Sequence, residues 1–214
     1  MLKRLYVRIR IGCVIGGGLI WLGVSTGCSP SVSPPALLLN IDGSMSTDAV
    51  RGKQMGVLDT LVQRMPVGSR FIVHRFDFRV SRIAGEHPNE PRDLWPVQDK
   101  DLKPSAGRKG TRPDLMLKHI TEQVIPVLQE QQIGVVLVWD GGNNGKSLKP
   151  YITQLAQNKR IRIVWLVGLK RELWPQVEPE FKALASSGRL MTSGLDDAPQ
   201  DVARFRERLQ RDDT

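Results

Sequence analysis

The sequence predicts an α/β fold: a doubly wound, mostly parallel six-stranded sheet with helices on both faces. Short apolar runs alternate with longer amphipathic stretches along the chain. Several of the runs are apolar at nearly every position, as strands are when both of their faces are covered. The chain has 214 residues, of which 40% are hydrophobic, and this is enough for one sizeable domain.

Six segments have the composition of strands, at 37–41, 70–76, 80–84, 133–139, 161–167 and 190–191. The second and third are separated by a tight turn near 77–79, so 80–84 is expected to be a short antiparallel strand at the edge of the sheet. The others are separated by helical patterns, which is the arrangement of parallel strands.

Helical spacing of apolar residues predicts helices over 48–65, from Thr111 to about 128, over 148–155, and around the apolar triads 177/181/184 and 202/205/209. Thr111 is expected to cap its helix, with Pro113 in the first turn, and Pro126 is expected to kink or shorten it. Gly188 is placed just after a helix, as a C-cap. Residues 85–110 have the composition of a long loop.

The N-terminal 27 residues have the order of a secretory signal: a basic segment, an apolar run of about fourteen residues, and small residues. The apolar run is short for a membrane span, which needs roughly twenty residues. Residues 28–35 are rich in Pro and Ser and are interpreted as a linker. The folded domain is therefore predicted to cover 36–211.

The segment that ends in Gly27-Cys28 resembles the lipobox of bacterial lipoproteins. The resemblance implies that Cys28 becomes the first residue of the mature protein and is lipidated. One departure is Ser25, where the family prefers Leu, Val or Ile. The alternative is an uncleaved signal anchor, and in both cases the domain is predicted to be membrane-anchored and extracytoplasmic.

Composition excludes several classes of function. The formal net charge is +9, but four of the basic residues lie in the first ten positions, which leaves a mildly basic domain without a nucleic-acid footprint. The only cysteines are Cys13 and Cys28. The domain itself therefore has no cysteine for a disulfide, a Cys-based zinc site or a Cys–His nucleophile.

Three separate segments place oxygen donors at comparable positions. Asp42, Ser44 and Ser46 directly follow the first strand, Asp140 follows the strand at 133–139, and Thr111 opens a helix. In an open α/β sheet the carboxyl ends of parallel strands share one edge, where ligands bind. Carboxylate and hydroxyl oxygens suit Mg²⁺, or Mn²⁺ and Ca²⁺, rather than zinc or copper.

These five residues resemble the metal-ion-dependent adhesion site of the von Willebrand factor A family, whose pattern is Asp-x-Ser-x-Ser, a distant Thr and a more distant Asp. The resemblance covers about residues 36–210, and Lys109 departs from it where the family usually has a Gly. It implies one divalent cation, of the Mg²⁺ type, that anchors an acidic residue of a protein partner. The chain is accordingly expected to be a binding module and not an enzyme.

Three other interpretations of the domain are less favoured by the sequence. The domain could be a metal-independent structural scaffold within an envelope assembly. Residues 140–147 nearly spell a phosphate-binding P-loop, although Asp140 stands in place of its first Gly, so nucleotide binding is not expected. The segment from Asn40 to Ser44 also resembles the phosphatase motif of the haloacid dehalogenase family, but Asn40 stands where that chemistry needs an Asp nucleophile.

Overall fold

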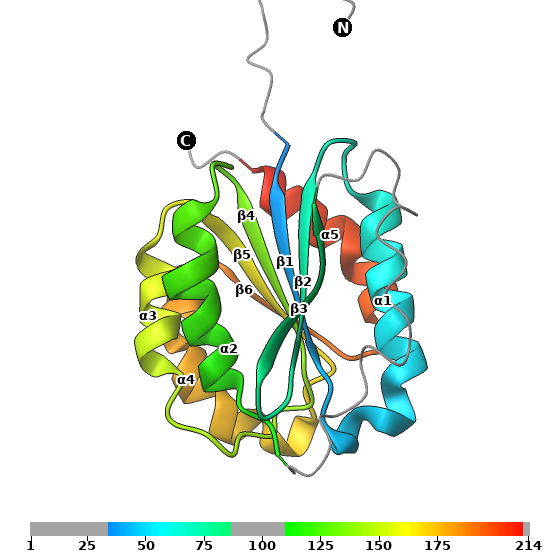
Figure 1. Ribbon diagram of the computed structural model, residues 1–214, viewed down its shortest axis with the longest axis vertical. Helices are drawn as coiled ribbons and strands as arrows, with labels where there is room; N and C mark the ends of the chain where they lie inside the picture. Colours follow the sequence, from blue (N-terminus) through cyan, green and yellow to red (C-terminus); the bar gives the residue numbers. More distant parts are fainter. Residues whose placement is uncertain (1–33, 87–109, 212–214) are drawn as a thin grey trace, which may run out of the picture. The chain divides into compact units, whose positions relative to one another are not determined.

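The computed structural model describes residues 34–86 and 110–211, both of which belong to one compact unit (Figure 1). The expected signal segment, Cys28, most of the linker and Lys109 lie outside the described residues. Within them, no helix has the length and apolarity needed to cross a membrane.

The sheet has six strands in the order β3-β2-β1-β4-β5-β6. Their bounds are β1 Ala36–Asp42, β2 Arg70–Phe76, β3 Val80–Glu86, β4 Ile133–Val138, β5 Ile161–Val167 and β6 Leu190–Ser193. All neighbouring pairs are parallel except β2–β3, which is antiparallel. The predicted fold class is therefore confirmed, although the antiparallel edge strand is as long as β2 and not short.

Helices cover both faces of the sheet (Figure 1). They are α1 Arg51–Arg64, α2 Pro113–His119, α3 Lys149–Gln157, α4 Trp174–Ser186 and α5 Ala198–Gln210. Helices α1 and α5 pack on one face, and α2, α3 and α4 pack on the other. This is the doubly wound arrangement that the alternation of apolar runs and amphipathic stretches predicts.

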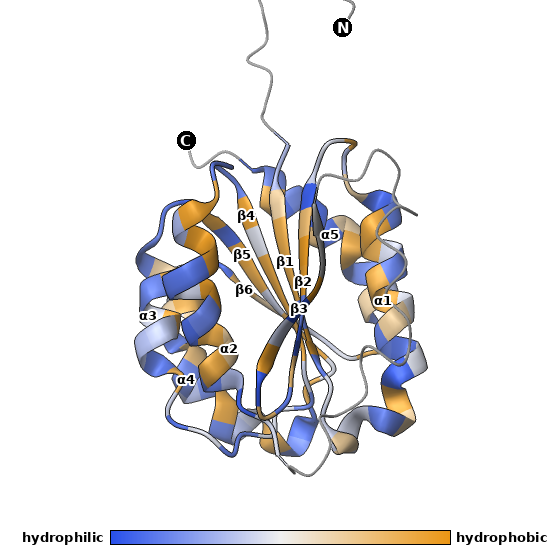
Figure 2. Cartoon of the chain, viewed as in Figure 1, coloured by the Kyte–Doolittle hydropathy of each residue, from blue (hydrophilic) through white to orange (hydrophobic). Residues whose placement is uncertain are grey.

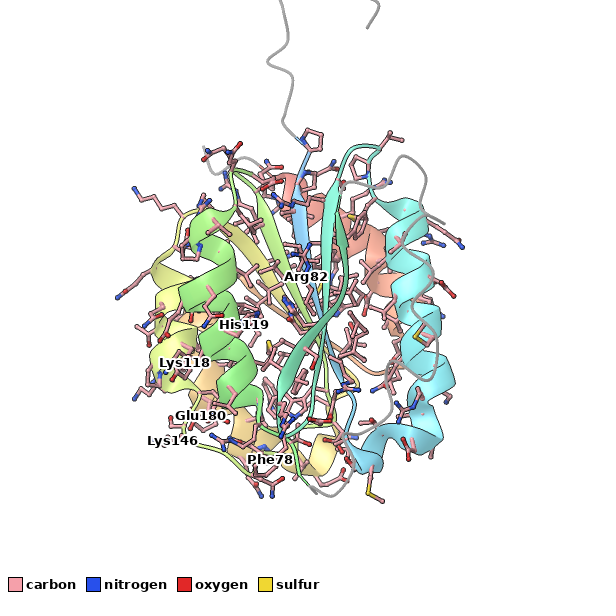
Figure 3. All side chains as sticks on the ribbon, viewed as in Figure 1. Phe78, Arg82, Lys118, His119, Lys146 and Glu180 are labelled. Carbon is pink, nitrogen blue, oxygen red and sulfur yellow. The ribbon has the colours of Figure 1, made fainter. Side chains whose placement is uncertain are left out.

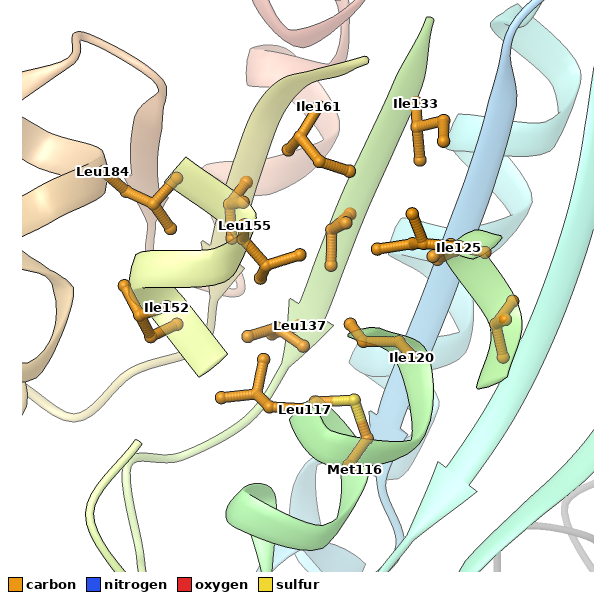
Figure 4. Close-up of a cluster of buried hydrophobic side chains, with 14 of the residues drawn as sticks. Met116, Leu117, Ile120, Ile125, Ile133, Leu137, Ile152, Leu155, Ile161 and Leu184 are labelled. Carbon is orange, nitrogen blue, oxygen red and sulfur yellow. The ribbon is translucent and has the colours of Figure 1, made fainter. Parts of the chain in front are cut away.

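The core consists of two apolar layers separated by the sheet. Alternate residues of a strand enter opposite layers, as Leu37 and Leu38 do, because side chains point alternately to the two faces of a sheet. Every residue of β1 is buried, and Figure 2 shows the apolar character of the central strands. Figure 4 shows how Leu137 of β4 packs in the layer formed by α2 and α3.

Two predicted helices begin or continue differently in the structure. The region 48–65 starts as a 3₁₀ turn, η1 (Met45–Val50), and becomes α-helical at Arg51. After α2 the chain forms a π-helical turn, η4 (Ile120–Val124), and a 3₁₀ turn, η5 (Ile125–Val127), which contains Pro126. Proline has no N–H for the helical ladder, so the expected shortening of this helix is confirmed.

The C-terminus of α4 is closed by Gly188, which has φ of +69°. Its N–H donates to the Ala185 carbonyl at 3.0 Å, and the N–H of Arg189 donates to the Leu184 carbonyl at 2.9 Å. These two bonds define a Schellman motif, in which Gly is favoured because its backbone enters the left-handed region without a steric penalty. The predicted C-terminal role of Gly188 is confirmed.

Two Gly→Ala substitutions are expected to have opposite effects on stability. A Cβ at Gly188 or at Gly56, inside α1, would contact nothing within 4 Å. The effect of each substitution on stability therefore depends only on the backbone conformation at that position. Gly188→Ala should lower the free energy of unfolding by about 1 kcal/mol, and Gly56→Ala should raise it by about 0.5–1 kcal/mol. Urea denaturation measures both, and a loss of stability in Gly56→Ala would contradict the assignment of an unstrained α1.

Candidate metal centre

The candidate site lies at the carboxyl ends of β1 and β4, which are adjacent and parallel, with Ile41 beside Val138. From β1 the chain first builds outward through β2 and β3, then returns to β4 on the other side of β1. The strand order therefore reverses between β1 and β4. In open α/β sheets such a reversal leaves a crevice at the ends of the strands, where ligands bind.

Asp42 is the most buried carboxylate of the site. Its side chain is fully buried, and Oδ1 accepts a hydrogen bond from the Ser44 N–H at 2.8 Å. Its Oδ2 is also buried but has no hydrogen-bond partner among the described residues. Burial raises the pKa of Asp42 to about 7, with the negative charges of Asp140 and Asp77 adding to the effect and Ser44 opposing it. An unpaired buried carboxylate oxygen calls for a cation or a proton.

The loop after β1 carries two hydroxyl groups. The Ser44 hydroxyl lies at the Asp42 carboxylate, and the Oγ atoms of Ser44 and Ser46 form a hydrogen bond of 2.9 Å. The Thr47 hydroxyl holds the loop by donating to the carbonyl oxygens of Asp42, at 2.9 Å, and Ser44, at 2.8 Å. Thr47 is fully buried, so it fixes the backbone of the loop and leaves the two serine hydroxyls at the site.

Asp140 enters the site from the end of β4. Its Oδ1 accepts the Gly142 N–H at 2.9 Å, and its Oδ2 accepts a hydrogen bond from Lys170 Nζ at 3.0 Å. Burial acts to raise the pKa of Asp140, but Gly142, Lys170 and the nearby Ser46 hydroxyl together hold it below its ordinary value. Asp140 is therefore ionised at neutral pH and already faces one cation.

Thr111 is buried in the loop that precedes α2. Its backbone is tied to Asn144 by two hydrogen bonds, from Thr111 N–H to Asn144 Oδ1 at 2.9 Å and from Asn144 N–H to the Thr111 carbonyl at 2.8 Å. The next N–H, of Arg112, donates to the Asp77 carbonyl at 2.7 Å. These bonds place the Thr111 loop at the same edge of the sheet, beside the ends of β2 and β4.

The structure thus links four of the five expected residues, through Asp42 with Ser44, Ser44 with Ser46, and Ser46 with Asp140. In the described part of the chain no hydrogen bond joins the Thr111 hydroxyl to those four. The expectation that Thr111 caps α2 is wrong, because the helix begins at Pro113, its N-cap is Arg112, and no side chain caps it.

Two neighbours of the site were not among the residues expected from the sequence. Lys170, which follows β5, pairs with Asp140, and Asp77, at the end of β2, adds negative charge near Asp42. For Asp77 a signal existed, because it ends a strand in the same way as Asp42 and Asp140. Lys170 lies three residues beyond the end of β5, and a lysine in a loop has no spacing that would distinguish it.

The donor set fits a small, hard divalent cation. Octahedral Mg²⁺ has ligands at about 2.0–2.1 Å, so neighbouring ligand oxygens are about 2.9 Å apart, which equals the spacing of the two serine Oγ atoms. Within the described ranges no three His, Cys, Asp or Glu side chains are placed to hold a metal ion among themselves. An ion here would depend on hydroxyl oxygens and water as well as on carboxylates, which suits Mg²⁺ and not zinc.

The P-loop interpretation is disfavoured by what occupies the N-terminus of α3 (Figure 3). The Glu180 carboxylate accepts hydrogen bonds at 2.7 Å from the N–H groups of Leu148 and Lys149 and from the Ser147 hydroxyl. In a P-loop the Ser or Thr hydroxyl at this position binds Mg²⁺, and free N–H groups at the start of the helix face the phosphates. Here the Glu180 carboxylate already occupies the Ser147 hydroxyl and two N–H groups at the start of α3.

The phosphatase interpretation fails on the position of Asn40. Asn40 is fully buried within β1, and its Nδ2 donates to the carbonyl oxygens of Leu38, at 3.0 Å, and Val136, at 3.1 Å. Its Oδ1 lies 3.1 Å from Nδ1 of the buried His74, which therefore donates. Burial, followed by the charges of His119 and Arg82, lowers the pKa of His74 to about 4. Both side chains are thus bound inside the sheet and away from any substrate.

Neither a protein-family model nor a curated protein matches the chain by sequence. Solved structures share its fold. Proximal thread matrix protein 1 from the mussel byssus aligns with a TM-score of 0.63 and 21% identity, over 82% of this chain and 46% of its own. A von Willebrand factor type A protein from Catenulispora acidiphila aligns with a TM-score of 0.62 and 12% identity, over 84% of this chain and 44% of its own.

An aerotolerance-related membrane protein from Bacteroides fragilis aligns with a TM-score of 0.60 and 14% identity, over 81% of this chain and 98% of its own. The chain spans less than half the length of the mussel and Catenulispora proteins. A further structure of the mussel protein has a metal-ion-dependent adhesion site occupied by zinc. At these identities the likeness establishes the fold: the chain has the von Willebrand factor A fold.

The perturbed pKa values of His74 and Asp42 should make the stability of the fold depend on pH in opposite directions. Between pH 4 and 6.5 the unfolded chain protonates His74 and the folded chain does not, so this residue makes stability rise with pH. Between pH 3.8 and 7 the folded chain protonates Asp42 and the unfolded chain does not, so this residue makes stability fall with pH. Each slope is at most about 1.4 kcal/mol per pH unit, and in the overlap they cancel.

Urea denaturation from pH 4 to 7.5 in EDTA tests this with two variants. Asp42→Asn should reveal the His74 contribution and become more stable as the pH rises to 6.5. His74→Gln should reveal the Asp42 contribution and become less stable as the pH rises to 7. Profiles of both variants that run parallel to the wild type would show that neither group is perturbed as described.

Proposed function

We propose that this domain binds a protein partner through a divalent cation of the Mg²⁺ type held at the carboxyl ends of β1 and β4. The observation that carries the proposal is the buried Asp42 Oδ2, which has no hydrogen-bond partner in the described structure. In the same loop the hydroxyls of Ser44 and Ser46 are hydrogen-bonded to each other at 2.9 Å, which is also the spacing of neighbouring octahedral ligands. The resemblance to a metal-ion-dependent adhesion site supports the same five residues.

In this proposal each residue has a distinct part. Asp42, Ser44 and Ser46 hold the ion from the loop after β1, and Asp140 balances its charge from the loop after β4. Thr111, whose loop lies at the same edge, completes the set by resemblance to the family. The ion supplies a Lewis-acidic position for an acidic side chain of the partner, so we propose a binding module and not an enzyme.

We propose further that the domain acts outside the cytoplasm, tethered to the membrane through lipidated Cys28. The order of basic, apolar and small residues in the first 27 positions supports this, as does the Gly27-Cys28 pair. A Pro- and Ser-rich linker separates the anchor from the domain and would hold the site off the membrane surface.

A second candidate function is a metal-independent scaffold with the same fold. One observation favours it: Asp140 is already paired with Lys170 at 3.0 Å, so half of the negative charge at the site is neutralised by the protein itself. A scaffold of this kind would bind its partner equally well in the presence of a chelator.

Ion binding is tested by isothermal titration of the purified domain with Mg²⁺ and Mn²⁺ at pH 7.5. We expect one site per chain, and a loss of affinity of at least tenfold in Asp42→Ala and Ser46→Ala, because each removes a ligand oxygen. Asp59→Asn, which removes a carboxylate on α1, is the control and should bind as the wild type does. Absence of any site in the wild type would reject the metal proposal.

Partner capture discriminates between the two candidate functions. Membrane extracts are passed over immobilised wild-type domain and Asp42→Ala, each with Mg²⁺ or with EDTA. Adhesion through the ion predicts that the captured protein is lost with EDTA and with Asp42→Ala. Retention of the same protein under all four conditions would favour the scaffold.

The tether is tested by labelling cells with an alkyne analogue of palmitate. The full-length wild type should carry the label and fractionate with membranes, and Cys28→Ser should carry none because it lacks the acceptor thiol. Cys13→Ser is the matched control and should label normally. Label on Cys28→Ser would overturn the lipoprotein assignment.

A further inference from the structure

Lys170 is attached to Asp140 at two points. The Lys170 N–H donates to the Asp140 carbonyl at 3.0 Å, and its Nζ donates to Asp140 Oδ2, also at 3.0 Å. The turn before it depends on Gly168, which has φ of +83° and whose N–H donates to the Ser193 carbonyl. These backbone bonds therefore fix the position of the Lys170 Cα atom, and the Lys170 ammonium is directed to the candidate metal centre.

The loops after β4 and β5 are packed so closely that only Gly fits at position 141. Gly141 has φ of +100°, and a Cβ there would lie 2.5 Å from Leu169 Cδ1 and 3.1 Å from Leu173 Cβ. This close approach keeps Lys170 beside Asp140. The pairing is thus built into the backbone of the two loops and does not rest on a chance orientation of a surface side chain.

The Lys170 ammonium faces the same charges that a metal ion would face. Its bond to Asp140, and then the charge of Asp140, raise the pKa of Lys170, and Asp42 adds to this effect. One positive charge therefore balances Asp140, while Oδ2 of Asp42 stays without a hydrogen-bond partner in the described structure. Lysine alone leaves the site half neutralised, whereas a divalent ion would satisfy both carboxylates.

Breaking the ion pair costs the Lys170 side chain less free energy than it costs the Asp140 side chain. The Lys170 side chain is 46% exposed and that of Asp140 only 10%. A lysine ammonium that turns into solvent is fully hydrated there, and an exposed ion pair costs little free energy to break. A mostly buried carboxylate without a partner is costly, so the two events are coupled: the ammonium should leave only when another cation arrives.

We propose that Lys170 is an internal counter-ion that competes with the divalent cation for Asp140, so that ion uptake is an exchange of ammonium for metal. The inference rests on the proposed metal site. In this exchange Lys170 keeps the ion-free domain folded and weakens the apparent affinity for the ion. Ion-dependent adhesion would then respond to the ion concentration outside the cell, because the ion-free state is stable.

The experiment compares Lys170→Met, which keeps most of the length of the side chain and removes its charge, with Lys182→Met, a control on the exposed side of α4. Titration with Mg²⁺ and Mn²⁺ should show about tenfold tighter binding to Lys170→Met than to the wild type. Thermal melting in EDTA should show a lower midpoint for Lys170→Met, and added Mg²⁺ should raise that midpoint more than it raises the midpoint of the wild type. Lys182→Met should behave as the wild type in both measurements.

A direct readout is the ¹⁵N resonance of the Lys170 side chain, assigned by its absence in Lys170→Met. It should shift on addition of Mg²⁺ in the wild type, because the ammonium loses Asp140. Lys170→Arg, which keeps the charge, should bind Mg²⁺ more weakly than Lys170→Met does.

The outcomes separate the two proposals. Equal Mg²⁺ affinity in the wild type and Lys170→Met overturns the exchange and leaves the proposed function standing. Ion uptake by Lys170→Met with much weaker uptake by the wild type supports the exchange. No uptake by either protein rejects the proposed metal site, and the exchange with it.

Discussion

A buried carboxylate at the end of the central strand is the constraint on which the rest of the site depends. Asp42 ends β1, the strand that lies between β2 and β4, and it is fully enclosed. One oxygen is satisfied by the loop that follows, and the other is not. Since a desolvated charge is costly, the fold has to supply a proton, a lysine or a metal ion at this position.

No backbone group near Asp42 in the described structure satisfies its second carboxylate oxygen. The loop after β1 is held by the N–H of Gly43, which donates to the Phe76 carbonyl at 2.8 Å, and by the buried Thr47 hydroxyl. These bonds satisfy the polar backbone of the loop without using the free oxygen of Asp42. The charge of Asp140, followed by that of Asp77, increases the negative potential at Asp42. The result is a rigid, electronegative position at the edge of the sheet, and rigidity is what a site for a small octahedral ion requires.

Lys170 connects the two functions that the fold allows. With the ammonium on Asp140, the domain has a stable ion-free form that could act as a scaffold. With a divalent ion in its place, the same edge gains an open Lewis-acidic position for an acidic partner. In the proposed exchange, the choice between an adhesion domain and a scaffold is an equilibrium governed by ion concentration.

The sequence was sufficient for the fold class, and it singled out four residues, Asp42, Ser44, Ser46 and Asp140, that the structure brings together. Short, bounded apolar runs such as Ile133–Val138 indicate strands buried on both faces, and Asp42 is marked by its place at the end of such a run. Lys170 and Glu180 were not predictable, because each acts across about 30 residues of chain on a partner brought near only by tertiary structure. The 3₁₀ start of the region before α1 was also missed, since helical spacing of apolar residues does not distinguish 3₁₀ from α over one or two turns.

The occupant of the site is tested most directly by diffraction from crystals grown with Mn²⁺, using anomalous differences to locate the ion. We expect one strong peak within about 2.5 Å of the Ser44 and Ser46 hydroxyl oxygens, with the Asp42 carboxylate facing it and the Lys170 ammonium displaced from Asp140. A map with no peak at this position, and with Lys170 still bonded to Asp140 at saturating Mn²⁺, would contradict the proposed metal site.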